Sequence, residues 1–181
     1  MIIILEAPDN CGKSTQVQKL IHLFHDKSIH QLHYSSVKGF ETKEETKTYS
    51  CKMYSDMFKL LFSNYKDMHF TLDRSHIGEM VYGPMYRDYD GNYVLNIENY
   101  WKDFEDFWNE IYLITFIDTP LRLVSRDDGL SFSIDLEKKT KEVELFKDAH
   151  NKSLIKHKLL IDIESLNEDQ VFEKIKEFIF K

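Results

Sequence analysis

A short apolar run at the start of the chain passes directly into a glycine-containing turn, and this junction constrains the fold more than any other segment. Residues 2–5 are three isoleucines and a leucine, the composition of a parallel strand that is buried on both faces. The turn that follows reads A-P-D-N-C-G-K-S, which is the phosphate-binding loop pattern with Ala7 in place of its first glycine. We expect a negative φ at Ala7, because only a positive φ requires glycine.

The same junction predicts a binding site for an oligophosphate. Backbone amides of such a loop, together with the N-terminus of the helix that it opens, form a cradle for phosphate groups. Lys13 is expected to reach the β- and γ-phosphates, and the Ser14 hydroxyl to contact Mg²⁺. The alternative is an ordinary strand–turn–helix corner without a ligand. That alternative gives no reason for a buried strand directly before the turn, at residues 2–5. The residues expected to form the cradle are Asp9, Asn10, Cys11, Gly12, Lys13, Ser14 and Thr15.

Length, charge and cysteine content limit the class of protein. The chain has 181 residues, enough for one domain, and no apolar run approaches the ~20 residues of a membrane-spanning helix. The net charge of −7 argues against duplex DNA as the main partner, although a local basic groove would not show in this sum. We interpret the two cysteines, Cys11 and Cys51, as reduced thiols of a cytoplasmic protein.

Strand-like and helix-like segments alternate along the chain, which predicts an α/β fold with a five-stranded parallel sheet and helices on both faces. No linker divides residues 1–181, so we expect a single domain. A polar loop is expected over residues 38–47, and Gly83-Pro84 is expected to end a helix. The expected strands are residues 2–5, 29–34, 69–72, 111–117 and 158–163, and the clearest expected helices are 15–26, 48–64, 97–110 and 168–180.

Charged residues follow the expected strands at the edge where open α/β sheets bind their ligands. Asp73 and Arg74 come directly after the strand at 69–72, and the planar guanidinium of Arg74 suits a phosphate. The alternative for this pair is a helix start with a surface ion pair. Glu6 is costly to bury alone, so it either pairs with Arg74 or acts on an acceptor. Asp9 would repel ATP phosphates and is expected to face an acceptor, which favours a kinase over a plain NTPase.

Two arginines four residues apart, Arg122 and Arg126, share one helical face. They are candidates for stabilising charge on a transferring phosphoryl group, although arginines on amphipathic helices are usually solvated. The eight histidines show no metal-ligand spacing.

With these residues in hand, the chain resembles the thymidylate kinase family of nucleoside monophosphate kinases and the related deoxynucleoside kinases. The resemblance rests on L-E-A-P-D-N-C-G-K-S-T-Q, on L-D-R-S followed by G-E-M-V-Y-G-P-M-Y, and on I-D-T-P-L-R-L-V-S-R. It implies a three-layer sandwich of the P-loop NTPase type. It also implies a kinase domain over residues 1–181 that converts dTMP to dTDP with ATP and Mg²⁺, and it suggests a homodimer.

The resemblance also implies roles for individual residues. Asp9 would contact the acceptor sugar, Asp73 would orient Mg²⁺ or water, and Arg74 would bind the acceptor phosphate. Arg126 would lead into a mobile lid over ATP at roughly residues 127–134. Two aromatic residues would lie beside the acceptor base, namely Phe40 and Tyr82.

The chain departs from this family in two places. Its phosphate loop and its lid lack the arginine that thymidylate kinases usually carry. After Asp-Arg it has Ser75 where the family usually has an aromatic residue; nucleoside kinases show this serine, and in them Glu6 would be the general base for a 5′-hydroxyl. A deoxynucleoside kinase, a kinase of a modified base or 5′ end in DNA, and a non-catalytic nucleotide-binding regulator therefore stay open. The cations that could replace the missing arginine are Arg122, Arg126, Lys138 and Lys139.

Overall fold

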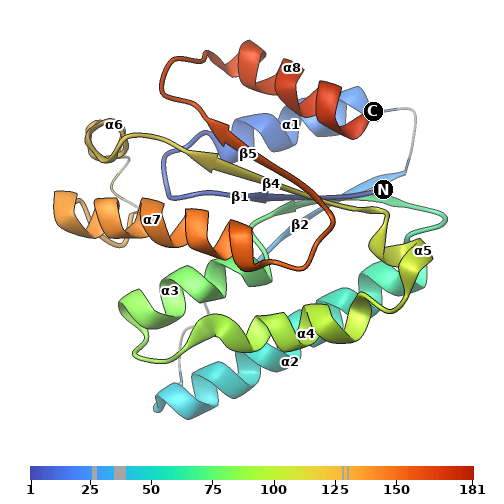
Figure 1. Ribbon diagram of the computed structural model, residues 1–181, viewed down its shortest axis with the longest axis horizontal. Helices are drawn as coiled ribbons and strands as arrows, with labels where there is room; N and C mark the ends of the chain where they lie inside the picture. The colour runs from blue at the N-terminus through green and yellow to red at the C-terminus, as the bar shows by residue number, and fades with distance from the viewer. Residues whose placement is uncertain (26–27, 35–39, 128, 130) are drawn as a thin grey trace.

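The computed structural model describes residues 1–25, 28–34, 40–127, 129 and 131–181. It shows a five-stranded sheet between two layers of helices, with α1 and α8 on one face and α2, α3, α4 and α7 on the other (Figure 1). The strands are β1 (Ile2–Glu6), β2 (Ile29–His33), β3 (His69–Asp73), β4 (Ile111–Ile117) and β5 (His157–Asp162). The helices are α1 (Lys13–Leu23), α2 (Lys43–Asn64), α3 (Glu79–Tyr86), α4 (Val94–Trp101), α5 (Glu105–Trp108), α6 (Pro120–Ser125), α7 (Leu136–Lys152) and α8 (Glu168–Ile179), and two 3₁₀ turns are η1 (His76–Gly78) and η2 (Gly91–Tyr93).

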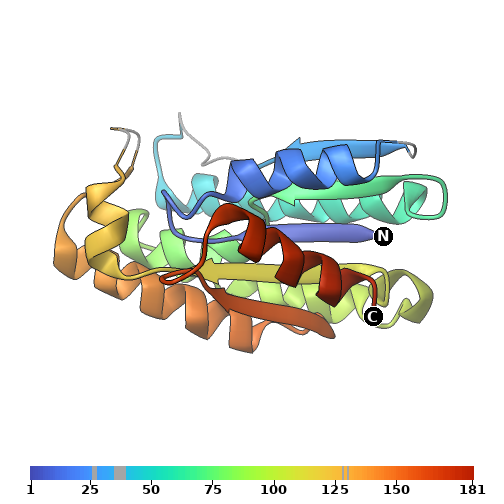
Figure 2. The ribbon, with the colours of Figure 1, turned by 90° about the horizontal axis from the view of Figure 1, so that it is seen from above.

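All neighbouring strands pair in parallel, in the order β2-β3-β1-β4-β5. This confirms the predicted α/β class and the five-stranded parallel sheet with helices on both faces. The strand order reverses at β1, and ligands of such sheets bind beyond the carboxyl ends of the strands at this reversal. Figure 2 shows the start of α1 and α6 at that same end of the sheet.

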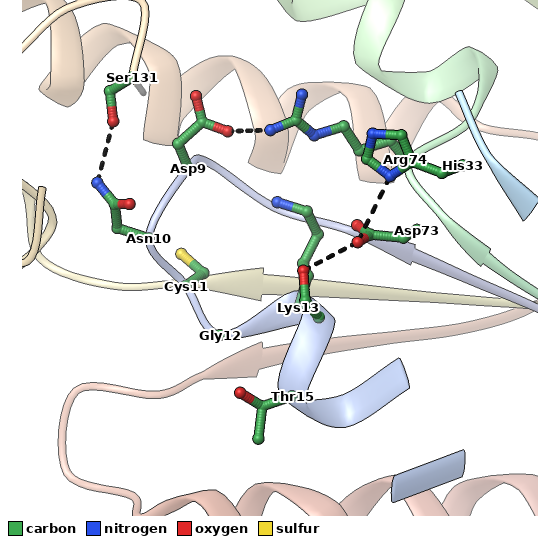
Figure 3. Close-up of a pocket in the computed structure, with 11 residues that line it drawn as sticks. Asp9, Asn10, Cys11, Gly12, Lys13, Thr15, His33, Asp73, Arg74 and Ser131 are labelled. Atoms are coloured by element: carbon green, nitrogen blue, oxygen red, sulfur yellow. Dashed lines mark hydrogen bonds and ion pairs between the residues drawn. The ribbon is translucent and has the colours of Figure 1, made fainter. Parts of the chain in front are cut away.

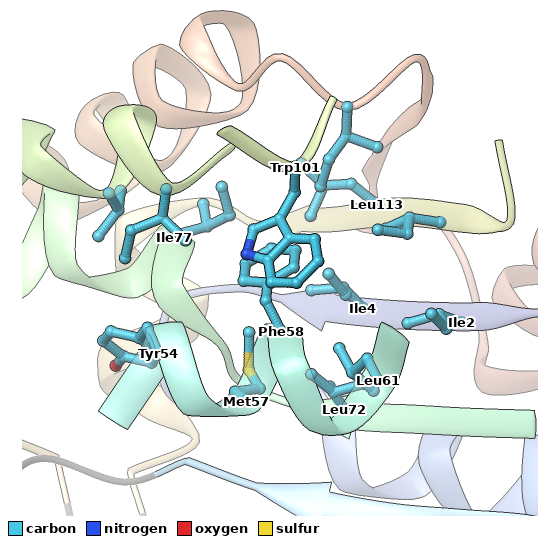
Figure 4. Close-up of a cluster of buried hydrophobic side chains, with 14 of the residues drawn as sticks. Ile2, Ile4, Tyr54, Met57, Phe58, Leu61, Leu72, Ile77, Trp101 and Leu113 are labelled. Carbon is cyan, nitrogen blue, oxygen red and sulfur yellow. The ribbon is translucent and has the colours of Figure 1, made fainter. Parts of the chain in front are cut away.

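The first strand is buried because both faces of the sheet are covered. Ile2 and Ile4 belong to the core under α2–α5, while Ile3 and Leu5 belong to the core under α1 and α8. Their side chains are at most 1% exposed, as expected for a strand without polar alternation. Figure 4 shows Ile2 and Ile4 facing Phe58 and its neighbours in the larger core.

Three predicted helix boundaries are wrong. Helix α2 begins at Lys43 rather than near residue 48, because Thr42 and Glu45 form a capping box. Pro84 lies inside α3, three positions before its C-cap, and its ring is exposed. The expected helix at 97–110 is two helices, α4 and α5, with a break between them. The expected helix end at residue 26, and residues 38–39 of the expected loop, lie outside the described residues.

Candidate functional site

A polar cavity of about 340 Å³ lies beyond the carboxyl ends of β1, β2 and β3. Figure 3 shows the side chains of Lys13, Asp73 and Arg74 converging on it. The whole predicted cradle lines this cavity, so the structure brings these residues together with both charged residues that follow β3. The lining residues are Asp9, Asn10, Cys11, Gly12, Lys13, Ser14, Thr15, His33, Asp73, Arg74 and Ser131.

The loop between β1 and α1 turns through two residues of left-handed backbone. Asn10 has a φ of 70° and Gly12 a φ of 72°. A Cβ on Gly12 would meet nothing within 4 Å, so glycine is favoured there by its φ and not by lack of room. Ala7 is not among the residues with positive φ, as predicted. Burial raises the pKa of the Cys11 thiol to about 12, so this loop residue adds no negative charge at neutral pH.

Lys13 lies folded across its own loop. Its ammonium donates to the carbonyl oxygens of Ala7 at 3.0 Å and Pro8 at 3.3 Å, and the residue is 6% exposed. Both partners are neutral oxygens, so the buried cation has no carboxylate at hydrogen-bond distance among the described residues. An anionic group in the cavity would supply the charge that this ammonium lacks.

The predicted metal ligands, Ser14 and Asp73, lie together. The Ser14 hydroxyl donates to Oδ2 of Asp73 at 3.0 Å, and Nδ1 of His33 lies 3.6 Å from the same oxygen. The other oxygen, Oδ1, is buried and has no hydrogen-bond partner in the described part of the chain. A buried carboxylate oxygen without a partner is costly, and a hard cation would satisfy it. Within the described ranges, no three His, Cys, Asp or Glu side chains are grouped to hold a metal ion by themselves.

Arg74 forms an ion pair with Asp9, from its Nη2 to Oδ1. Its backbone is left-handed, with a φ of 71°, and its amide donates to the carbonyl oxygen of Leu5 at 3.1 Å. Such backbone is sparsely populated for a residue with a side chain and is found where the surroundings enforce it. Burial opposes the charge of Arg74, but the Asp9 carboxylate raises its pKa overall. The guanidinium is thereby held as a cation at the rim of the cavity.

Glu6 does not pair with Arg74, which corrects one of the two roles expected for it. Its Oε1 accepts hydrogen bonds from the Ser75 amide at 2.6 Å and the Ser75 hydroxyl at 2.8 Å. The residue is fully buried, and burial raises the pKa of its carboxyl group. Its Oε2 has no partner among the described residues and lies 3.6 Å from where a Cβ on Gly78 would be.

Arg122 and Arg126 share one buried carboxylate. Nε of Arg122 lies 3.5 Å and Nη1 of Arg126 3.1 Å from Oδ2 of Asp118, which follows β4. Arg126 is the more exposed of the two arginines, with 44% of its side chain accessible. It borders a second cavity of about 390 Å³ on the other side of the phosphate loop, lined by Asn10, Cys11, Gly12, Gln16, Arg126, Ile163, Leu166, Asn167, Glu168 and Val171.

The expected lid is only partly described, because residues 128 and 130 lie outside the described residues. Its described part is tied to the phosphate loop by Asn10. The Asn10 amide donates to the Ser131 hydroxyl at 3.0 Å, to Oδ1 of Asp127 at 3.4 Å and to the carbonyl oxygen of Leu123 at 3.3 Å. The loop and the lid segment therefore touch directly.

A third, small cavity of about 20 Å³ lies on the far side of Arg74 from the phosphate loop. Tyr82 lines it, and its place beside an acceptor base stays a prediction. Phe40 does not: it is 41% exposed and packs against Tyr49 with ring centroids 5.0 Å apart, so its place beside a base stays a prediction. The lining residues are Tyr34, Tyr54, Arg74, Ser75, Gly78, Glu79, Tyr82, Arg87 and Phe132.

Several residues that line these cavities were not predicted from the sequence, among them His33, Glu79, Arg87 and Phe132. His33 ends β2 and lies opposite Asp73 in the sheet register, so its position at a strand end was the available signal. Glu79, Arg87 and Phe132 carry no such signal, because a short helix, its C-cap and the lid segment bring them together only through tertiary packing.

Three solved structures match nearly the whole chain. The YorR protein of Bacillus subtilis, in complex with phosphorylated GDP, matches with a TM-score of 0.69 and 20% identity over 99% of this chain and 96% of that one. The thymidylate kinase of Candida albicans matches with a TM-score of 0.66 and 15% identity, over 99% of this chain and 90% of that one. The deoxyadenosine kinase of M. mycoides with bound dATP matches with a TM-score of 0.62 and 14% identity, over 100% of both chains.

The chain has the P-loop NTPase fold. This confirms the fold that the resemblance to thymidylate kinases and deoxynucleoside kinases implies. No model of a known protein family matches the chain, and no curated protein matches its sequence. None of the helices in the described ranges is long and apolar enough to cross a membrane.

Proposed function

We propose that this protein is a nucleotide kinase that transfers the γ-phosphoryl group of ATP to a deoxynucleoside monophosphate, with dTMP as the foremost candidate. One observation carries the proposal: Arg74 lines both the polar cavity at the phosphate loop and the small cavity beyond it. A donor held by the loop and an acceptor in the second cavity would meet at this guanidinium. The solved structures of similar fold support the class, because they include a thymidylate kinase and a deoxyadenosine kinase.

The donor nucleotide would lie across the phosphate loop. Its polyphosphate would occupy the 340 Å³ cavity and draw Lys13 from the carbonyl oxygens that it now contacts. Its base would lie in the 390 Å³ cavity, which shares Asn10, Cys11 and Gly12 with the first cavity and has Arg126 at its border.

Ser14 and Asp73 would hold Mg²⁺. They fit a hard cation because they offer adjacent oxygen ligands, one of which is buried without a partner in the described chain. Two protein oxygens suit Mg²⁺, which usually keeps waters and binds substrate phosphates. When bound, the ion would neutralise charge on the phosphoryl oxygens.

We assign the role of the missing arginine to Arg126. It borders the proposed donor site and nearly half of its side chain is exposed, so it can turn toward a phosphoryl group. Lys139 is less suited, because it is 1% exposed and already paired with Glu142 at 2.9 Å. Transition-state charge would thus be shared between Lys13 and Arg126.

A deoxynucleoside kinase is the second candidate, because the buried Glu6 with its raised pKa lies next to Ser75. Against it, Ser75 already occupies Oε1 of Glu6, whereas Arg74 lines both cavities and its guanidinium would bind a phosphate between them. Among the described residues the two cysteines are free thiols, which fits the proposed cytoplasmic location. A homodimer through the exposed Tyr100 and Phe104 on α4 and its C-terminal flank stays a proposal.

A panel of acceptors tests the function. ADP release from ATP would be measured with deoxynucleoside monophosphates, deoxynucleosides and a 5′-hydroxyl oligonucleotide. We expect turnover with monophosphates, dTMP among the best, and much less with the others. If thymidine is turned over as fast as dTMP, the protein is a deoxynucleoside kinase and the proposal is wrong. If the protein binds ATP but phosphorylates none of these acceptors, the non-catalytic nucleotide-binding regulator is the function that remains.

A further inference from the structure

Arg87 lies beside the small cavity. It is the C-cap of α3 and lines the small cavity but not the polar one, whereas Arg74 lines both. An acceptor with its phosphate at Arg74 would therefore extend toward Arg87 with its other end. For a nucleotide that end is the base.

A buried carboxylate holds Arg87 in place. Nη1 of Arg87 donates to Oε1 of Glu79 and to the Tyr89 hydroxyl at 3.2 Å. Oε2 of Glu79 accepts from the hydroxyls of Tyr89 at 2.7 Å and Tyr93 at 3.2 Å. Burial opposes the charge on Arg87, but the Glu79 carboxylate raises its pKa overall. This network leaves a permanent cation with one nitrogen committed.

The other two nitrogens of Arg87, Nε and Nη2, make no hydrogen bond to any of the described residues. The side chain is 13% exposed, and the residue lines the small cavity. A guanidinium donates hydrogen bonds and accepts none. Its free edge can therefore pair only with hydrogen-bond acceptors.

The turn that presents Tyr89 and Tyr93 to Glu79 packs against α3 without spare room. A Cβ on Gly91 would lie 1.9 Å from the carbonyl oxygen of Glu79, and one on Gly83 would lie 3.1 Å from the ring of Tyr89. Only glycine allows the backbone of η2 to approach α3 so closely. The orientation of Arg87 is therefore built into the fold rather than left to a loose surface contact.

The walls of the small cavity suit a flat ring. They include the rings of Tyr34, Tyr54 and Tyr82, and the ring of Phe132 from the lid segment. Phe132 lies stacked on Tyr86, with centroids 4.9 Å apart and planes 21° apart, and 5.5 Å from Tyr82. A nucleobase cannot fit in the remaining 20 Å³, so lining side chains must move when a base enters, and Phe132, which is 45% exposed, is the candidate.

We propose that Arg87 determines the base specificity of the acceptor, by donating a hydrogen bond to the keto oxygen at C4 of a pyrimidine or C6 of a purine, on the base edge that enters the aromatic cavity. This inference rests on the proposed kinase function and names its substrate class: thymine, uracil and guanine are accepted, and cytosine and adenine are disfavoured. Each of those two bases carries an amino group at this position, which is itself a hydrogen-bond donor. Opposite Arg87, neither donor would find an acceptor. Glu79 is a positioning residue for Arg87.

Base analogues test this on the unchanged protein. Binding of dGMP would be compared by titration calorimetry with binding of 2-aminopurine deoxyriboside monophosphate, which lacks the keto oxygen at C6 and, with it, the proton on N1. We expect the analogue to bind at least about tenfold more weakly. Equal affinities would overturn the base-reading role. Monophosphates that bind but are never phosphorylated would refute the kinase proposal alone, and failure of every monophosphate to bind would refute both.

Variants then assign the discrimination to Arg87. For Arg87→Gln we expect kcat/KM for dTMP and dGMP to fall at least about tenfold while that for dCMP and dAMP changes little, so that the preference shrinks. Arg87→Lys keeps the charge and one donor and should restore part of the preference. The control is Lys176→Gln on α8, across the sheet, which also removes one positive charge and should leave the preference unchanged. A uniform loss with all four nucleotides would show a phosphate contact or a structural role and would overturn the proposal.

Discussion

The two cavities that meet at Arg74 differ in lining and in openness. The cavity at the phosphate loop has about 340 Å³ of space and a polar, charged wall. The cavity beyond Arg74 has about 20 Å³, and its wall includes four aromatic residues, one of which is Phe132 from the lid segment. The cavity at the phosphate loop has room for a ligand, whereas the small cavity must widen before a nucleobase can enter. We infer that donor binding needs little rearrangement and that acceptor binding is coupled to movement of the lid segment.

The largest effect is expected at the open cavity. Lys13→Ala should lower kcat/KM by about 10³-fold for every acceptor, because it removes a cation that neutralises the transferring phosphoryl group. Lys19→Ala, on the same helix but in a surface ion pair with Asp169, is the control and should leave activity unchanged. The measurement is ADP release, with circular dichroism to check the fold. Full activity of Lys13→Ala would contradict the proposed donor site.

The residue shared by both cavities should show the next largest effect. Arg74→Ala is expected to raise KM for a monophosphate about 10- to 100-fold, since it removes charge-assisted hydrogen bonds to the acceptor phosphate. Its effect on thymidine, measured in the same assay, should be much smaller. Arg74→Lys should recover part of the loss. Equal losses for nucleotide and nucleoside would mean that Arg74 does not clamp the acceptor phosphate.

A smaller effect is expected from opening the closed cavity. Phe132→Ala should lower the Kd of dTMP by less than about tenfold, because the ring no longer competes for the space between the tyrosines. The Kd of an ATP analogue should stay unchanged. Phe180→Ala, which truncates an exposed ring on the other face, serves as control. Weaker dTMP binding in Phe132→Ala would mean that this ring supports the acceptor instead of excluding it.

The smallest effect concerns stability beneath the closed cavity. The pKa of Glu6 is raised by burial, so the folded state holds its proton more tightly than the unfolded chain, and this contribution is lost as pH rises above the ordinary value of 4.5. The free energy of unfolding of Glu6→Gln should therefore rise relative to that of wild type between acid and neutral pH. Urea unfolding at several pH values measures this. A stability difference independent of pH would contradict the raised pKa.

The parts of the site that could be predicted are those formed by neighbours in the sequence. The residues from Asp9 to Thr15 form one loop, and a strand before it and a helix after it suffice to identify its shape. Asp73 and Arg74 could be placed because the carboxyl ends of parallel strands share one edge of a sheet. The pairing of Glu6 with Arg74 was wrong because Ser75 lies closer to Glu6 in the folded chain, which no spacing in the sequence reveals.

The sequence alone determined the order of strands and helices, the parallel sheet and the phosphate-binding loop, since these depend on local hydrophobic pattern and backbone geometry. Only the tertiary structure decided which side chains wall the second cavity, because Tyr34, Tyr82, Arg87 and Phe132 come from separate segments. It also decided that Arg87 would be held by Glu79 with two nitrogens free. Burial selects such partners by proximity in space, and that proximity exists only once the helices have packed onto the sheet.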